Sequence, residues 1–157
     1  MDLRELYQET ILDHNKAPRN YGEIPGASHT AHGHNPLCGD RVTVQACVDD
    51  QGRITEVRFQ GNGCAISTAS ASMLTEALQG KTVAEANTLV DRFQELIRLG
   101  ADGSDEELQA SLGKLAVFAG VCDYPSRVTC ATLAWHTLRS ALETTGADAS
   151  TGPVTTE

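Results

Sequence analysis

The chain has 157 residues, of which 40% are hydrophobic and 21% are charged, so we expect one domain with a buried core. Twelve Lys and Arg residues oppose 21 Asp and Glu residues, which gives a formal net charge of -9. This balance argues against a nucleic-acid partner, because binding to phosphates requires clustered basic side chains. No apolar run reaches about 18 residues, so we expect no membrane span.

The five cysteines raise the question of the redox compartment. The first ten residues, MDLRELYQET, lack the basic and then apolar pattern of a signal peptide. We therefore expect a cytoplasmic location, in which thiols stay reduced and can serve as ligands or nucleophiles.

The first predicted element is a helix over residues 2–15, in which apolar side chains recur near helical spacing. Pro18 and Gly22 end it, and we expect a loop rich in Gly, Pro and His as far as Asp40. The histidines of this region suggest a metal tract, but we interpret it as a flexible, solvated loop; they are His29, His32 and His34.

Residues 41–48, RVTVQACV, change to a period of two, which is typical of a strand with one buried face. The turn DDQG follows, and RITEVRFQG predicts a second strand. Together they predict an antiparallel hairpin.

Helices dominate the rest of the chain. One is predicted from Cys64 to Gly80, and Thr82 with Glu85 has the spacing of a capping box for another that ends near Leu99. Ser104 repeats that signature for a third helix, and the last is expected over residues 130–143, after the break at Pro125. The polar residues 144–157 predict a disordered tail. We therefore predict an α+β fold, with a short antiparallel sheet packed on one side by several helices, in a single domain over residues 1–143.

Three cysteines lie beside turn formers or chain breaks: Cys38 in NPLCGD, Cys64 in GNGCAIS and Cys130 in RVTCATLAW. We expect Cys64 and Cys130 at helix starts, where the partial positive charge favours a thiolate. Asp40 can add an oxygen ligand, and three sulfurs with one oxygen suit a tetrahedral Zn²⁺ site. Packed thiols explain the same residues equally well, so the residues alone leave both readings open.

Two further cysteines, Cys47 in a strand and Cys122 after an apolar run, favour packed thiols. Arg127 lies three residues before Cys130, where a guanidinium would offset the negative charge of a thiolate-rich zinc site. From the residues alone, a surface arginine is the better interpretation of Arg127.

The motifs together resemble the U-type iron–sulfur cluster assembly proteins of the IscU/NifU-N family. The similarity runs through LYQETILDHNKAPRNYG, NPLCGD, VRFQGNGCAISTASASMLTEAL and RVTCATLAW, and thus covers about residues 3–143. It is closer to the SufU branch, whose members carry an added segment before the last cysteine and an arginine at the position of Arg127. IscU proteins have a histidine at the position of Thr129, and SufU proteins usually have a lysine there, so Thr129 departs from both patterns.

This resemblance implies a Zn²⁺ bound by Cys38, Asp40, Cys64 and Cys130. It implies a zinc-dependent sulfurtransferase that accepts persulfide sulfur on Cys38 from a PLP-dependent cysteine desulfurase (SufS-like) and passes it to downstream iron–sulfur assembly proteins. We expect Cys38 and Arg127 to serve catalysis.

Two alternatives stay open. The first is a scaffold on which a [2Fe–2S] cluster is assembled and transferred, since the same ligands suit iron. The second is a structural zinc adaptor, which an aspartate ligand argues against because closed structural sites usually use Cys and His.

Overall fold

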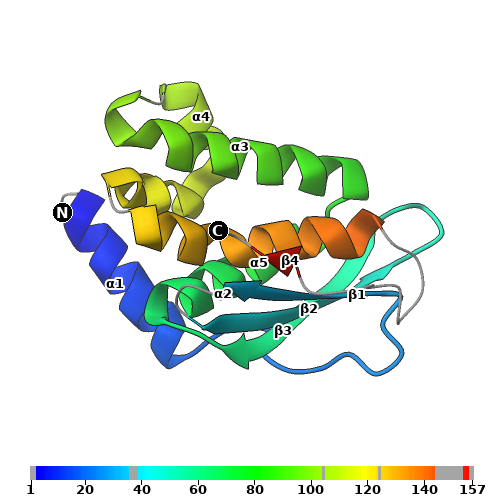
Figure 1. Cartoon of the computed structure of the whole chain (residues 1–157). Helices are drawn as coiled ribbons and strands as arrows, with labels where there is room; N and C mark the ends of the chain where they lie inside the picture. The colour runs from blue at the N-terminus through cyan, green and yellow to red at the C-terminus, as the bar shows by residue number, and fades with distance from the viewer. Residues whose placement is uncertain (1–2, 36–38, 104, 124, 144–153, 156–157) are drawn as a thin grey trace.

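The structure, a computed structural model, describes residues 3–35, 39–103, 105–123, 125–143 and 154–155 (Figure 1). Along the chain the elements are α1 (Leu3–Lys16), β1 (His29–Asn35), β2 (Asp40–Val48), β3 (Ile54–Asn62), α2 (Ala65–Leu78), α3 (Val83–Gly103), α4 (Glu106–Leu112), the 3-10 helix η1 (Gly113–Asp123), α5 (Pro125–Glu143) and β4 (Val154–Thr155).

The sheet has the strand order β3-β2-β1-β4, with antiparallel pairing in β1–β2 and β2–β3 and parallel pairing of β4 with β1. The predicted hairpin is β2–β3, and the predicted alternation puts Val42, Val44 and Ala46 on the buried face. The α+β prediction is confirmed.

The helices lie on one face of the sheet, and α5 packs directly on β1 and β2 beside α2 (Figure 1). A second layer of α3, α4 and η1 covers the other side of α5. Three aromatic rings join these layers, because Phe93 stacks on Trp135 with 4.2 Å between centroids and meets Phe118 edge-on at 5.5 Å. The buried hydroxyl of Ser70 accepts the Trp135 indole N–H at 2.9 Å, so this polar group is satisfied inside the core.

The prediction of a histidine-rich loop was wrong, because residues 29–35 form strand β1. Its inward positions include Ala31 and Gly33, which are small and allow close approach to α5. A Cβ atom at Gly33 would lie 2.1 Å from Thr137 Oγ1. The strand therefore depends on its packing against α5. The sequence of β1 has no hydrophobic alternation that would predict this packing.

The last helix also starts earlier than predicted, because Pro125 is the first residue of α5. Proline suits that position, where the missing N–H costs no helical hydrogen bond. The capping box of Thr82 and Glu85 is confirmed by its two reciprocal hydrogen bonds, of 3.0 and 3.1 Å. Helix α4 is capped by Asp105, whose carboxylate accepts from the Leu108 amide at 2.8 Å, whereas the predicted cap Ser104 lies outside the described residues.

The division between a domain over residues 1–143 and a disordered tail stays a prediction. Residues 144–153 and 156–157 lie outside the described residues, and the two described tail residues form β4.

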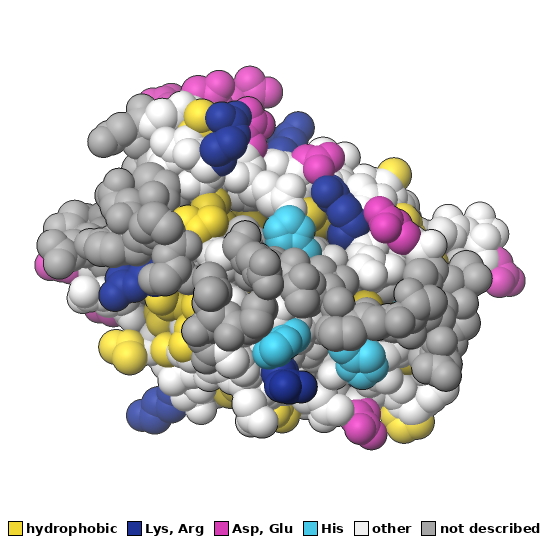
Figure 2. All heavy atoms as spheres, in the orientation of Figure 1, with side chains coloured by type: hydrophobic (Ala, Val, Ile, Leu, Met, Phe, Trp, Pro, Cys, Tyr) yellow, Lys and Arg dark blue, Asp and Glu magenta, His cyan; other side chains and the backbone are white. Residues whose placement is uncertain are grey.

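Among the described helices, none combines the length and apolar character needed to cross a bilayer. On the face seen in Figure 2, histidine side chains gather over the sheet and α5, with acidic and basic side chains interspersed.

A buried histidine ties α1 to α2. His14 Nδ1 lies 2.7 Å from Ser72 Oγ, which also accepts the Arg19 backbone N–H at 2.9 Å. Burial lowers the pKa of His14, the nearby Arg19 guanidinium lowers it further, and Glu76 partly opposes this. The folded protein therefore favours the neutral imidazole.

We expect acidification to weaken the fold through His14. The folded-state pKa lies below the unfolded value of about 6.5, so the unfolded chain binds more protons and stability falls as the pH drops from about 7 toward 5. His14→Gln should lower the free energy of unfolding by about 1 kcal/mol at pH 7.5, because the hydrogen bond of His14 is lost. The free energy of unfolding of this variant should nevertheless depend less steeply on pH than that of the wild type. Urea unfolding of chelator-treated protein at several pH values measures this. His32→Gln, at an exposed histidine, is the control, and equal slopes for wild type and His14→Gln would contradict the assignment.

We expect Gly33→Ala to destabilise the protein by about 1–3 kcal/mol, because the new methyl group overpacks the contact with α5. The double variant Gly33→Ala/Thr137→Ala should lose less than the sum of the single losses, since the second change removes the clashing Oγ1. Gly120→Ala is the control, because a Cβ there meets nothing within 4 Å. Chemical denaturation of the wild type and of these four variants measures the losses, and strictly additive losses would count against this contact.

Candidate metal centre

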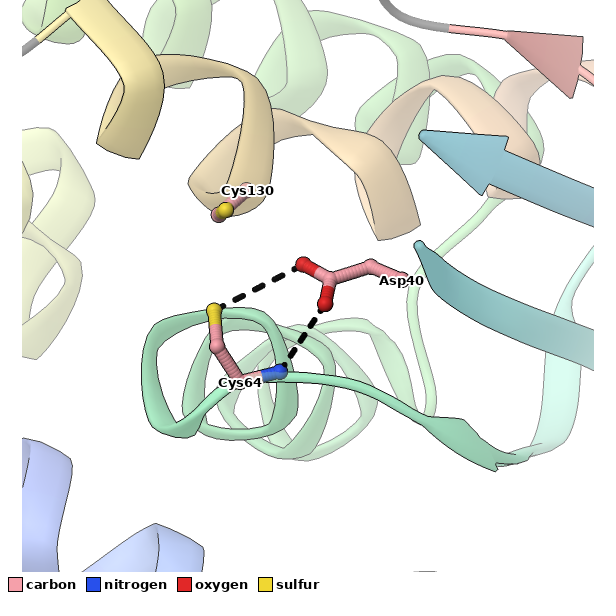
Figure 3. Close-up of side chains that lie close together, drawn as sticks. All are labelled: Asp40, Cys64 and Cys130. Carbon is pink, nitrogen blue, oxygen red and sulfur yellow. Dashed lines mark hydrogen bonds between the residues drawn. The ribbon is translucent and has the colours of Figure 1, made fainter. Parts of the chain in front are cut away.

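Three of the predicted ligands converge between the sheet and two helices. Asp40 is the first residue of β2, Cys64 precedes α2, and Cys130 lies in α5. One ligand atom from each lies within 4.8 Å of the other two, and Figure 3 shows the three side chains directed toward one another. Among the described residues, this is the one such group of three or more His, Cys, Asp and Glu side chains.

The Asp40 carboxylate is buried and held by both of its oxygens. Oδ1 accepts the Cys64 backbone N–H at 3.0 Å, and Oδ2 lies 3.5 Å from Cys64 Sγ (Figure 3). The position of Asp40 follows from the β1–β2 hairpin, in which it pairs with Asn35. The Gly39 N–H donates to Asn35 O at 2.8 Å and closes the loop between the strands. The hairpin thereby fixes the carboxylate at the start of α2.

Cys64 is the N-cap residue of α2, as the sequence predicted. Its backbone is extended, with φ -71 and ψ 171, and its sulfur accepts the Ser67 N–H at 3.4 Å. The sulfur therefore lies at the N-terminus of α2, where it satisfies one of the free amide groups of the first turn. Cys64 is exposed, so this side of the centre is accessible.

Cys130 does not lie at a helix start, because α5 begins at Pro125. It is buried, with 7% of its surface exposed. Burial, followed by the neighbouring Cys64 thiol and Asp40 carboxylate, raises the pKa of Cys130 far above its usual value. Burial and these two neighbours therefore oppose the ionisation of Cys130, and a bound cation would offset that effect.

The donor set fits a zinc ion. With bonds of about 2.3 Å to sulfur and about 2.1 Å to oxygen, a tetrahedral ion separates a sulfur and an oxygen ligand by about 3.6 Å. The observed distance from Cys64 Sγ to Asp40 Oδ2 is 3.5 Å. Two sulfurs and one oxygen leave one position of a tetrahedron for another ligand.

The predicted fourth ligand, Cys38, lies outside the described residues. The described ends of its loop are Asn35 and Gly39, which the closing hydrogen bond joins. Cys122 lies within η1, and its side chain is also outside the described part. Cys47 is part-buried on β2 and does not belong to the group of ligands.

Sequence reasoning missed Asn35. This fully buried residue donates from Nδ2 to Thr129 Oγ1 at 2.9 Å and so joins the hairpin to α5, one residue before Cys130. The hydroxyl of Thr129 is thus engaged with the hairpin. An Asn next to a Pro in NPLCGD was the signal available for Asn35, but it also marks an ordinary turn.

Arg127, also predicted for the site, is exposed on the first turn of α5.

We expect Cys130→Ser to weaken Zn²⁺ binding by more than about 100-fold, because loss of an outer-shell partner alone typically costs 10- to 100-fold. Competition with a chromophoric chelator, on protein purified without oxygen, measures the affinity. Cys47→Ser is the matched control, because that thiol lies outside the group. Zinc binding by Cys130→Ser at the wild-type level would rule out Cys130 as a ligand.

Comparison with known proteins gives one consistent result. The model of the NifU-like N terminal domain matches residues 6–131. A protein named iron-sulfur cluster assembly scaffold protein IscU, from Streptococcus pyogenes, is 38% identical over 141 residues, which cover 90% of this chain and 85% of that protein. A protein named zinc-dependent sulfurtransferase SufU, from Bacillus subtilis, is 37% identical over 141 residues, with coverage of 90% and 92%.

Comparison with solved structures indicates the same family. A crystal structure described as a putative iron-sulfur cluster assembly scaffold protein for the SUF system, from Fervidobacterium islandicum, superposes with a TM-score of 0.77 at 36% identity. The match covers 88% of this chain and 98% of that one. The chain therefore belongs to the NifU-like N-terminal domain family, together with the IscU and SufU proteins of iron–sulfur cluster assembly.

Proposed function

We propose that the protein is a zinc-dependent sulfurtransferase that accepts persulfide sulfur from a cysteine desulfurase for iron–sulfur cluster assembly. The observation that carries the proposal is the convergence of Asp40, Cys64 and Cys130, with Cys38 bonded directly to the described Gly39. The similarity to the SufU protein of Bacillus subtilis, which is named a zinc-dependent sulfurtransferase, supports it.

The proposed ligands are Cys38, Asp40, Cys64 and Cys130. A Zn²⁺ ion held by them would keep the thiols deprotonated and neutralise most of their charge. The hydrogen bond from the Cys64 amide orients Asp40, so its carboxylate can hold its position when a neighbouring ligand moves.

Cys38 is the proposed sulfur acceptor. It precedes Gly39 directly in the sequence and stands two residues before Asp40. Cys64 and Cys130 are tied to helices, whereas Cys38 stands in the sequence between the end of β1 and the start of β2. The Cys38 thiolate attacks the terminal sulfur of the donor persulfide. One S–S bond breaks and another forms, the donor cysteine leaves as a thiolate, and no external oxidant is needed.

Arg127 is proposed to assist through its charge. It lies one helical turn before Cys130, and its guanidinium can offset the excess negative charge of a site with three thiolates and a carboxylate. A PLP-dependent desulfurase is the proposed sulfur donor, and downstream iron–sulfur assembly proteins are the proposed recipients. We place this exchange in the cytoplasm, where thiols stay reduced.

The second candidate is a scaffold for a [2Fe–2S] cluster. The relative from Streptococcus pyogenes is named an iron-sulfur cluster assembly scaffold protein, and thiolates bind iron as well as zinc. Against it, Thr129 replaces the histidine that the IscU pattern places before the last cysteine, and its hydroxyl accepts a hydrogen bond from Asn35. This observation makes sulfur transfer our first choice.

We expect wild-type protein, incubated with a desulfurase and cysteine, to gain sulfur that a thiol reductant removes. Cys38→Ala should reduce this transfer to background, because the attacking thiolate is gone. Mass spectrometry of the alkylated protein measures the added sulfur, and fragmentation locates it. Cys47→Ala is the control and should accept sulfur at the wild-type rate.

Metal analysis of the same anaerobic preparation separates the two functions. Equimolar zinc with strong stimulation of desulfurase turnover supports transfer. Equal amounts of iron and acid-labile sulfide, passed to an apo-protein, would support the scaffold instead. Persulfide found on Cys64 in place of Cys38 would move the acceptor role to that residue.

A further inference from the structure

Two large hydrophobic side chains stand out as exposed among the described residues, Leu12 at 66% and Tyr21 at 50%. A single exposed apolar residue such as Leu12 on α1 is normal and needs no explanation. Tyr21 differs because contacts on both its ring and its hydroxyl fix a half-exposed side chain in place. That combination of exposure and rigidity calls for a physical reason.

The Tyr21 ring is held against β3. It meets Phe59 edge-on, with centroids 5.2 Å apart and planes at 83°. Its hydroxyl donates to Gly61 O at 3.2 Å and accepts the Gly61 N–H at 3.4 Å. The side chain therefore has little rotamer freedom left to lose when something covers it.

The backbone of this segment is fixed as well. The Gly22 N–H donates to Phe59 O at 2.9 Å, and the Phe59 N–H donates to Asn20 O at 3.1 Å. Asn20 adopts φ 56, a conformation that few non-glycine residues take, and its side chain donates to Thr75 Oγ1 at 3.1 Å. Hydrogen bonds of its backbone and side chain thus fix Asn20, the residue before Tyr21, in a left-handed conformation that asparagine tolerates better than most residues.

Tyr21 contacts the end of β3, which pairs with the start of β2 and leads to the candidate metal centre. Gly61, which it contacts, is the penultimate residue of β3, and residues 61–64 form an exposed segment that ends at Cys64. Gly61 cannot carry a side chain, because a Cβ would lie 2.1 Å from Arg41 O, so the chain bends close to β2 at this point. The exposed ring is therefore tied to the segment that ends at a zinc ligand.

We propose that Tyr21 is the aromatic anchor at which the sulfur-donating protein docks beside the metal centre. The inference rests on the proposed function, since a protein that delivers a persulfide to this centre must cover the surface beside it. Tyrosine is enriched at interaction hot spots, and an aromatic ring that is already fixed loses little entropy on binding. The partner surface should offer an apolar pocket next to the persulfide-bearing cysteine.

A purely positioning role for Tyr21 predicts a different result from a docking role. If the hydroxyl served only to hold the segment of residues 61–64, loss of the hydroxyl would weaken zinc binding. If the ring is the docking contact, loss of the ring weakens partner binding and leaves zinc affinity in place. Tyr21→Phe removes the hydroxyl alone, and Tyr21→Ala removes both.

The test measures KM for the desulfurase and kcat in sulfur transfer, together with zinc affinity, for zinc-loaded full-length protein. We expect Tyr21→Ala to raise KM for the partner about 5- to 30-fold, the range from a significant contact to a hot spot, with kcat and zinc affinity near wild type. Tyr21→Phe should stay within about twofold of wild type in all three quantities. Leu12→Ala, at the other exposed apolar side chain, is the matched control and should not change KM.

An unchanged KM for Tyr21→Ala, with active wild type, would overturn the anchor and leave the proposed function standing. Equal rises in KM for Tyr21→Ala and Leu12→Ala would overturn it too, because the effect would not be local to Tyr21. Loss of zinc affinity in Tyr21→Phe would assign Tyr21 to positioning and exclude the docking role. If wild type accepts no sulfur at all, the proposed function itself fails.

Discussion

The hydrogen bond from the Cys64 amide to Asp40 Oδ1 joins two segments of the candidate metal centre. It connects the start of β2 to the N-terminus of α2, although β3 lies between these two elements in the sequence. The same carboxylate places its other oxygen 3.5 Å from the Cys64 sulfur. One side chain thus fixes the helix start and presents a ligand atom, and the close packing of α5 on the sheet then brings Cys130 to the same point.

Much of this arrangement could be predicted from local patterns. The alternation of Val42, Val44 and Ala46 predicted β2, and the glycines before Cys64 predicted a loop-to-helix junction. Strand β1 could not be predicted in the same way, because its sequence HTAHGHN has no apolar alternation. Gly33 must stay small because α5 lies so close, and that constraint belongs to the tertiary structure.

The errors at α5 have a different cause. Pro125 was interpreted as a break, yet proline is also favoured at the first position of a helix, and sequence alone does not separate the two roles. The position of Cys130 was therefore misjudged by more than one turn, although its role as a candidate ligand stands. Asn35 was missed because its partner, Thr129, is distant in the sequence.

The hydrogen bond between Asn35 and Thr129 has a consequence for folding. The candidate ligands come from three segments that are far apart in the chain. The Asn35–Thr129 bond likewise joins the hairpin to the last helix. Contacts between distant segments close late in folding, because long loops must lose their entropy first. A nascent or partly folded chain therefore has cysteines but no assembled centre. If the site binds a metal, as proposed, its affinity depends on a complete domain, and metal occupancy would then report that folding has finished.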